Sequence, residues 1–147
     1  MIEKEELLSV IPHRGRMLLL SRIVDFNTEE KSIEAQFDIT ENCLFFDPSV
    51  SGVPSWAGFE FIAQAISAFI GIRDRGKKIH KVGYILSVSQ MSIAIPFLKS
   101  GGIITIKTRE IDGMDPVYVF QGEVSLDGEK AVEGKVTVMD VQEEDNN

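Results

Sequence analysis

The sequence predicts an α+β fold in which an antiparallel sheet wraps around one long helix. Residues 56–72 carry apolar side chains on nearly every side, which is typical of a helix that is buried all round. Two strand-like runs precede this stretch and four follow it. Only a sheet curved around the helix would cover most of its surface. This fold also predicts that Trp56, the single tryptophan, is buried.

The chain before the helix is expected to form one short helix, two strands and a loop. These are helical turns at residues 3–10 stopped by Pro12, a mostly apolar strand at 17–26, an alternating strand at 32–40, and a loop at 45–54 rich in Pro, Ser and Gly. In residues 32–40 the apolar side chains occupy every second position, which predicts a half-buried strand. Ser55 is expected to cap the long helix.

Strands account for most of the chain after the helix. They are expected at residues 82–88, 103–111, 117–126 and 131–139, with a turn at 96–102. The apolar residues change parity after Val88, so a bulge is expected near Ser89 and Gln90. Asp127-Gly128 predicts a hairpin between the last two strands, because glycine tolerates positive φ.

Composition narrows the class of protein. The chain has 147 residues, 44% of them hydrophobic, which predicts a single domain at residues 1–140 and a polar tail at 141–147. The net charge of −8 argues against nucleic-acid binding. One cysteine and two histidines predict no internal disulfide and no metal site. The charged N-terminus predicts a cytoplasmic protein, and the long helix is too short and too polar for a membrane span.

Three polar residues interrupt the apolar helix. Glu60, Gln64 and Ser67 share one narrow stripe at helical spacing. A carboxylate in a buried helix must be paired or hydrogen-bonded. Glu60 is therefore either a structural residue bonded to a neighbouring strand or a carboxyl that faces a pocket, where it would act as general acid or base with Gln64 orienting it.

The N-terminal end of the long helix is a candidate binding site. A loop with Gly52 and Pro54 leads into it, and free backbone N–H groups there favour negative charge. Gly58 would let a ligand approach the backbone, so an oxyanion on a thioester carbonyl could be held beside Glu60.

The segment after the helix is the one dense basic run in this acidic chain. Its cations are Arg73, Arg75, Lys77, Lys78 and Lys81. They form either a solvated loop near a helix C-terminus or a docking patch for an anionic partner.

Several motifs carry a family resemblance in the same order along the chain. They are Pro12-His13-Arg14 before a run of leucines, Thr40-Glu41-Asn42 before Phe45-Phe46, Glu60 with Ala63-Gln64-Ala65, and Pro96 to Gly101 leading into a strand. Together they resemble bacterial 3-hydroxyacyl-ACP dehydratases of the hotdog fold. The run Gly-Val-Pro-Ser-Trp-Ala-Gly-Phe-Glu-Phe-Ile-Ala-Gln at residues 52–64 is similar to the predicted dehydratase branch linked to aryl-polyene pigments.

One departure concerns the catalytic residues. The family pattern continues after the double Phe with Gly-His-Phe-Pro, whose His is half of the catalytic pair. Here Phe46 is followed by Asp47-Pro-Ser. The resemblance carries the family's Glu to Glu60 and its helix Gln to Gln64, and the His to nothing. Either His13 or Asp47 replaces the missing group, or the chain is not a dehydratase of the usual kind.

Three functions follow from the resemblance and the residues. The first is reversible dehydration of a 3-hydroxyacyl thioester on acyl carrier protein, without cofactor, by Glu60 and a second group. Its expected substrate-binding residues are Gly52, Pro54, Trp56, Gly58 and Gln64. The second is thioester hydrolysis with Glu60 as general base, and the third is a non-catalytic acyl-binding or partner subunit. The resemblance also implies a homodimer or larger homo-oligomer with sites at a two-fold interface, and the basic run as its contact with the carrier protein.

Overall fold

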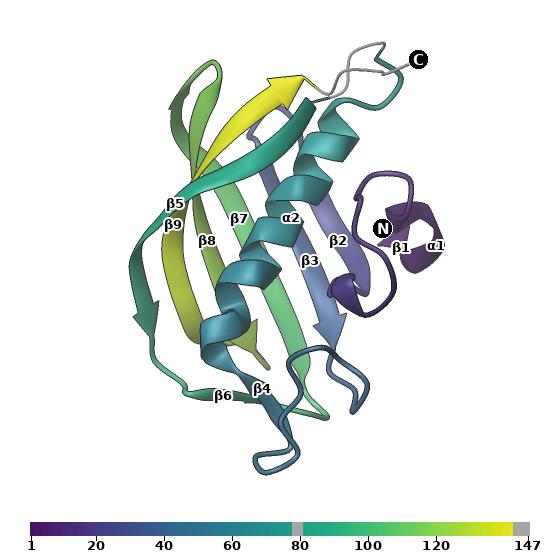
Figure 1. Ribbon diagram of the computed structural model, residues 1–147, viewed down its shortest axis with the longest axis vertical. Helices are drawn as coiled ribbons and strands as arrows, with labels where there is room; N and C mark the ends of the chain where they lie inside the picture. Colours follow the sequence, from purple (N-terminus) through teal and green to yellow (C-terminus); the bar gives the residue numbers. More distant parts are fainter. Residues whose placement is uncertain (78–80, 143–147) are drawn as a thin grey trace.

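The computed structural model describes residues 1–77 and 81–142, apart from the side chains of Arg16, Lys81 and Val82. Within these residues, seven strands form an antiparallel sheet that curves around the helix α2 (Gly58–Arg73), as Figure 1 shows. The strand order is β1-β2-β3-β7-β8-β9-β5. The bounds are β1 Ile2–Glu3, β2 Arg22–Asn27, β3 Ser32–Asp38, β5 Lys81–Ile93, β7 Ile103–Met114, β8 Val117–Leu126 and β9 Glu129–Gln142. The predicted hotdog fold is confirmed.

The central helix is packed on every side. None of the sixteen residues of α2 is exposed, and ten of them are buried. Phe61 packs against Phe37 of β3 with ring centroids 5.0 Å apart, and Phe69 packs against Phe120 of β8 at 6.2 Å. The expectation that this helix is too short and too polar to span a membrane is wrong by length and composition, because residues 55–73 reach a mean hydropathy of 1.3. Their burial inside the sheet is that of a core helix.

Local patterns in the strands are confirmed residue by residue. In β3 the side chains of Ile33, Ala35 and Phe37 are buried and alternate with half-buried or exposed neighbours. β5 changes register between Ser89 and Ser92, where the bulge was expected. The β8–β9 hairpin turns at Asp127 and Gly128, which both have positive φ.

The N-terminal half differs from its prediction. The helix expected at residues 3–10 is only α1 (Lys4–Leu7), which follows directly on β1. The strand expected from residue 17 begins at Arg22, and a 3₁₀ turn, η1 (Gly15–Met17), stands before it. Leu18, Leu19 and Leu20 are buried without belonging to a strand, because this segment packs against α2 and the N–H of Leu19 bonds to a helix side chain.

The start of the long helix also differs from its prediction. A 3₁₀ turn, η2 (Ser55–Ala57), precedes α2, so Ser55 is not the N-cap. The Ser55 side chain is buried instead, and its Oγ has no hydrogen-bond partner among the described residues. The expectation that Trp56 is buried is wrong, because its side chain projects from this turn and is 56% exposed.

Two short strands in predicted loops were missed. β4 (Gly52–Pro54) and β6 (Phe97–Lys99) pair with each other below the main sheet. Three residues each are too few to show an alternating pattern. Their pairing fixes the loop that enters the N-terminal end of α2.

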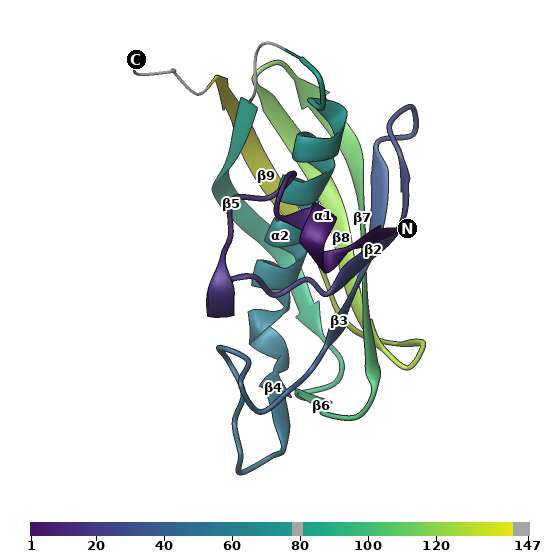
Figure 2. The ribbon, with the colours of Figure 1, turned by 90° about the vertical axis from the view of Figure 1, so that its right-hand side faces the viewer.

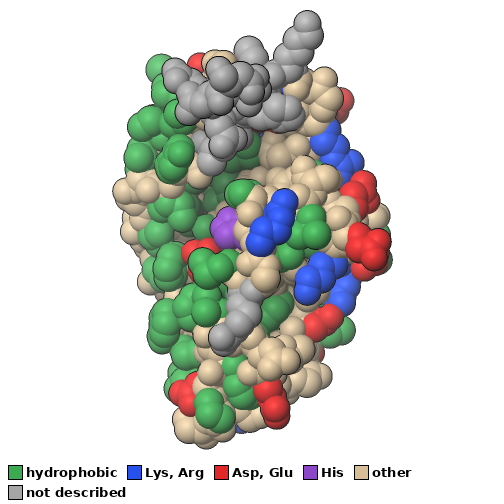
Figure 3. All heavy atoms as spheres, turned by 45° about the vertical axis from the view of Figure 1, so that its right-hand side comes forward, with side chains coloured by type: hydrophobic (Ala, Val, Ile, Leu, Met, Phe, Trp, Pro, Cys, Tyr) green, Lys and Arg blue, Asp and Glu red, His purple; other side chains and the backbone are tan. Residues whose placement is uncertain are grey.

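One edge of the main sheet is apolar and open. β5 pairs with β9 on one side only, and no described strand covers its other side. Its exposed apolar residues are Tyr84, Ile85, Leu86, Val88 and Ile93. Figure 3 shows hydrophobic side chains gathered along one side of the molecule and most charged side chains along the other.

Candidate active site

The polar stripe of α2 faces the N-terminal segment, which runs alongside the helix in Figures 1 and 2. Gln64 is the buried member of the stripe, 1% exposed. Its Oε1 accepts the N–H of Leu19 at 2.8 Å, and its Nε2 donates to the carbonyl of Met17 at 2.6 Å. The same Nε2 lies 3.3 Å from Oε1 of Glu60, to which it donates. The predicted orienting role of Gln64 thus has a geometric basis.

His13 meets Glu60 from the N-terminal segment. Nε2 of His13 lies 3.9 Å from Oε1 of Glu60, and each side chain is 26% exposed. Glu60 is therefore half-buried, within reach of solvent or a ligand. The buried Nδ1 of His13 has no hydrogen-bond partner among the described residues. Of the two candidates for the missing family His, the structure brings His13 to Glu60.

The charge state of His13 follows from its surroundings. Burial lowers the pKa of His13 below its ordinary value of 6.5, the Glu60 carboxylate opposes this shift, and the Arg14 guanidinium adds to it. His13 is therefore neutral near pH 7 and can accept a proton. A neutral imidazole beside a carboxyl provides two proton-transfer groups at one place.

Arg14 is a residue whose role the sequence did not reveal. Its guanidinium donates to three main-chain carbonyls of its own segment, those of Leu8, Ile11 and His13, at 2.6 to 2.9 Å. These bonds close the bend that presents His13 to the helix. The Pro12-His13-Arg14 motif was the available signal, but a motif does not show what a guanidinium binds.

Asp47, the other candidate for the second group, is engaged in its own loop. Its Oδ1 accepts hydrogen bonds from the N–H and the hydroxyl of Ser49, which lower the pKa of Asp47 below its ordinary value. A carboxylate held ionised in this way is a poor proton donor. The described contacts do not join it to Glu60.

Among the binding residues expected around the helix N-terminus, the two glycines are packed against other parts of the chain, whereas Trp56 is exposed. Gly52 and Pro54 lie in β4, where Gly52 faces the Leu98 carbonyl so closely that a Cβ would lie 2.3 Å from the oxygen. Gly58 packs against Val132 of β9, and its N–H already donates to the Ser55 carbonyl. Packing thus explains both glycines without a ligand. The exposed Trp56 touches the ring of Phe45 edge-on and offers an aromatic surface.

Three cations of the basic run, Arg73, Arg75 and Lys77, form ion pairs within the chain. Arg73 binds Asp74 at 3.0 Å and the buried Asp140 of β9 at 3.1 Å, which ties the end of α2 to the sheet. Arg75 lies 3.3 Å from Glu6, and Lys77 lies 3.7 Å from Asp74. Lys78 and the side chain of Lys81, also expected to contact the carrier protein, lie outside the described residues, as does most of the predicted tail at 141–147.

A cavity of about 610 Å³ lies along the same helix stripe. Its lining comes from the N-terminal segment, the second half of α2 and β5, and includes Leu8, Ile11, Arg14, Ser67, Gly71 and Gly83. Arg14 adjoins His13 in the chain, and Ser67 continues the stripe from Glu60 and Gln64. The cavity thus borders Arg14 and Ser67, and its lining includes neither His13 nor Glu60.

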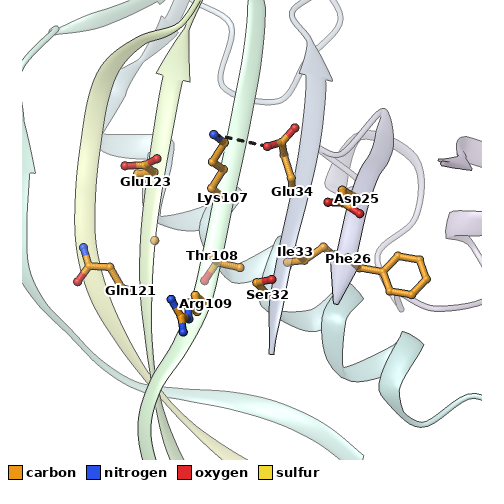
Figure 4. Close-up of a pocket in the computed structure, with 11 residues that line it drawn as sticks. Asp25, Phe26, Ser32, Ile33, Glu34, Lys107, Thr108, Arg109, Gln121 and Glu123 are labelled. Atoms are coloured by element: carbon orange, nitrogen blue, oxygen red, sulfur yellow. Dashed lines mark ion pairs between the residues drawn. The ribbon is translucent and has the colours of Figure 1, made fainter. Parts of the chain in front are cut away.

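A second hollow, of about 320 Å³, lies on the outer face of the sheet (Figure 4). Its lining includes Glu34 of β3 and Lys107 of β7, which form an ion pair at 3.6 Å. Glu34 alternates with the buried residues that face α2, so it points away from the helix. This hollow is thus separate from the candidate site. Among the described residues, no cluster of His, Cys, Asp and Glu could hold a metal ion.

Comparisons with known proteins show the family of the chain. Residues 5–147 match the family described as ApeP-like, ApeP dehydratase. A 3-hydroxyacyl-[acyl-carrier-protein] dehydratase, FabZ, of Campylobacter hominis is 27% identical over 144 residues, which are 95% of this chain and 97% of that protein. FabZ of Chlamydia trachomatis is 27% identical over 106 residues, covering 70% of this chain and 69% of that one.

Solved structures show the same fold. A chain of the dehydratase heterocomplex ApeI:P from Xenorhabdus doucetiae superposes with a TM-score of 0.80 at 20% identity, covering 94% of this chain and 91% of that one. A hypothetical thioesterase with coenzyme A from Streptococcus pneumoniae gives a TM-score of 0.64 at 10% identity, covering 94% and 93%. The family match over nearly the whole sequence identifies the chain, which belongs to the ApeP-like dehydratases.

Proposed function

We propose that the chain removes water from 3-hydroxyacyl thioesters on acyl carrier protein and forms trans-2-enoyl thioesters. Family membership supports the reaction, and the FabZ relatives support the substrate class. The observation that carries the proposal is the 3.9 Å contact between His13 and Glu60. It supplies the second proton-transfer group that the sequence lacks after Phe46.

The two groups divide the elimination between them. Neutral His13 accepts the proton from C2, and the electron pair of that C–H bond forms the C2=C3 double bond. The C3–O bond breaks, and the hydroxyl leaves as water with a proton from Glu60, because in the reacting state the pair holds one proton, which is on Glu60 while His13 is neutral. The proton on His13 then returns to Glu60 across the short distance between them. The substrate has lost H and OH, and both side chains are restored.

Replacement of Glu60 tests the reaction. Glu60→Gln keeps the shape of the side chain but removes its ionisable group, so enoyl formation should fall at least about 10²-fold. The melting temperature should hold or rise slightly, because a half-buried carboxyl has been removed. Enoyl product is measured with a 3-hydroxyacyl thioester, and free thiol with an acyl thioester, so that hydrolysis would be detected.

The exposed carboxylate Glu41 provides the matched control. Glu41→Gln should change neither rate nor melting temperature. A Glu60→Gln protein that melts early but keeps normal turnover per folded molecule would make Glu60 a structural residue and exclude the proposed mechanism.

A non-catalytic partner subunit is the second candidate. Asp47, which follows the double Phe, is held in its loop by Ser49, and the ApeI:P structure is a heterocomplex. The wild-type protein would then form neither enoyl product nor free thiol alone, and would bind acyl thioesters or raise the activity of a second dehydratase chain.

We further propose that the carrier protein docks on the basic run. Arg73 is half-buried and engaged with Asp74 and Asp140. Arg75 and Lys77 are exposed, so an acidic partner can compete for them with Glu6 and Asp74, and Lys78 and Lys81 belong to the same run. Reversing Lys77 and Lys78 to Glu should weaken carrier binding and flatten its dependence on salt. Lys99→Glu, at the exposed end of β6 and at the other end of the molecule, is the control and should leave both unchanged. Equal loss in both variants would contradict docking on the basic run.

We also propose an assembly state, a pathway and a cellular location for the protein. The apolar free edge of β5 supports assembly of two copies side by side, as a homodimer or a larger homo-oligomer. The pattern at residues 52–64 supports a role in aryl-polyene assembly. We also propose that the chain acts in the cytoplasm.

A further inference from the structure

The hollow on the outer face of the sheet, shown in Figure 4, has no part in the proposed reaction. Its volume of about 320 Å³ lies at the lower end of the range of roughly 300–1,000 Å³ that is typical of small-molecule sites. Ile33 and Thr108 border the hollow, although their buried side chains point toward α2, so they contribute main chain to its floor. Its walls are formed by the outward-facing side chains of neighbouring strands.

One row of these side chains is already paired. Glu34 of β3, Lys107 of β7 and Glu123 of β8 stand opposite one another across the strands. Lys107 lies 3.6 Å from Glu34 (Figure 4), and Glu123 lies 3.2 Å from Lys130 of β9. Both carboxylates of this row therefore have a cation beside them.

Arg109 stands in the next row and has no such partner. Its neighbours across the strands are Ser32 of β3 and Gln121 of β8, which are uncharged. Among the residues that the structure describes, no carboxylate forms an ion pair with its guanidinium. A guanidinium can bind both oxygens of a carboxylate at once, and an amide and a hydroxyl offer further donors. This side of the hollow is thus suited to a carboxylate.

Asp25 presents the opposite charge on the other side of the hollow. It is exposed in β2, and its neighbour across the strands is Glu34, which is paired with Lys107. Within the described part of the chain Asp25 itself forms no ion pair. Two carboxylates that stand opposite each other repel. An ammonium group would relieve this repulsion.

The two unpaired charges are separated by a strand. Asp25 lies on β2 and Arg109 on β7, with β3 between them, and their opposite residues on β3 are two positions apart. Strand spacing and residue rise place the two Cα atoms on the order of 12 Å apart. A small molecule can contact both side chains only if several bonds separate its own two charges.

We propose that this hollow binds a small zwitterion that carries a carboxylate at one end and an ammonium group at the other. The carboxylate lies against Arg109 and the Gln121 amide, and the ammonium group lies against Asp25 and Glu34. A molecule with one charge leaves one side of the hollow unpaired. The proposal is independent of the proposed dehydration, because α2 lies on the other face of the sheet.

Three linear probes with the same number of carbon atoms test this proposal. They are 6-aminohexanoate, which carries both charges, hexanoate, which carries the carboxylate, and hexylamine, which carries the ammonium group. Each is titrated into the isotope-labelled full chain, and the NMR shifts of main-chain amides report where it binds. We expect 6-aminohexanoate to give saturable shifts around the hollow with a Kd on the order of 1–10 mM. Each probe with one charge should bind about two- to fivefold more weakly, the scale of one exposed ion pair.

Two substitutions separate the two ends of the site. Arg109→Gln should weaken 6-aminohexanoate and hexanoate by a similar factor and leave hexylamine unchanged. Asp25→Asn should weaken 6-aminohexanoate and hexylamine and leave hexanoate unchanged. Lys99→Gln removes the same charge as Arg109→Gln but lies on β6, outside the hollow, so it should bind every probe like the wild type. All three positions are exposed, so each variant should melt like the wild type.

Several results would overturn the proposal. Equal binding of the three probes, or an effect of Lys99→Gln as large as that of Arg109→Gln, would mean that the surface attracts charge without a specific site. The proposal also fails if no saturable shifts occur around the hollow, or if Arg109→Gln and Asp25→Asn bind 6-aminohexanoate as tightly as the wild type does.

Discussion

At the scale of single residues, the environment of His13 suits the proposed role of this histidine beside Glu60. Its Nδ1 is buried and Arg14 lies next to it, so the imidazole resists protonation. Glu60 stands 3.9 Å away and receives a hydrogen bond from Gln64. A neutral base and an oriented carboxyl are the two requirements of the elimination.

The pH dependence of the rate follows from this environment. His13 must be neutral to accept the C2 proton, and burial lowers its pKa below 6.5. The acid limb of the kcat/KM profile of the wild-type protein, where protonation of His13 removes the base, should therefore have its midpoint below pH 6.5. Arg14→Gln removes a positive charge that lowers this pKa, so the decline should begin at a higher pH.

Arg109→Gln serves as the control, because Arg109 lines the hollow on the outer face of the sheet. It should leave the position of the decline unchanged. A pH profile of Arg14→Gln identical to that of the wild type would show that His13 does not limit the rate in acid.

At the scale of elements, the N-terminal segment matters as much as the central helix. Its buried leucines and the contact at Gly71 hold it against α2, although between residues 8 and 14 it forms no helix or strand. Gly71→Ala would place a methyl group 1.9 Å from the Val10 carbonyl oxygen, so the segment must move away.

This displacement should lower the free energy of unfolding of Gly71→Ala by about 1–3 kcal/mol. A lower melting temperature in Gly71→Ala, together with a loss of turnover per folded molecule, is the expected result. Ser67→Ala, on the same helix but adding no atom, should keep both. Normal turnover in Gly71→Ala would show that the position of the segment does not affect catalysis.

The sequence predicts an element well when neighbouring residues in the chain determine its structure, and poorly when distant residues do. The alternation in β3, the bulge in β5 and the Asp127-Gly128 turn each have a cause within a few residues, and all three were predicted. The buried leucines after Met17 were assigned to a strand that begins only at Arg22. Their burial is due to α2, whose Gln64 lies 45 residues from Leu19 in the chain.

The residues of the candidate site divide in the same way, into those that periodic spacing predicts and those that depend on distant contacts. Glu60 and Gln64 could be placed on one stripe because helical spacing is periodic. The approach of His13 to Glu60 could not be derived, because it depends on the Arg14 bonds and the Gly71 contact, which no spacing encodes. Trp56 was expected inside because a tryptophan beside a buried helix usually is, but the 3₁₀ turn before α2 directs it outward.

At the scale of the whole molecule, charge and apolar surface are separated. The outer face of the sheet carries cross-strand ion pairs, such as Lys107 with Glu34 and Lys130 with Glu123, and suits contact with water. The edge strand β5 has no charged side chain between Lys81 and Ile93. Natural proteins place charges or prolines on edge strands that must stay unpaired, and β5 carries neither between Lys81 and Ile93.

Assembly through this edge gives the last prediction. Leu86 of β5 is 51% exposed and Ile103 of the inner strand β7 is 50% exposed, so the two differ in position rather than in exposure. Leu86→Lys puts a charge on the apolar edge, where pairing with a second copy would bury it at high cost. Sedimentation at micromolar concentration should therefore show an oligomer for the wild type and for Ile103→Lys. Leu86→Lys should sediment as a species near 16.4 kDa. If both variants assemble like the wild type, or the wild type is itself monomeric, the free edge of β5 is not the interface and the exposed Trp56 becomes the next surface to test by substitution.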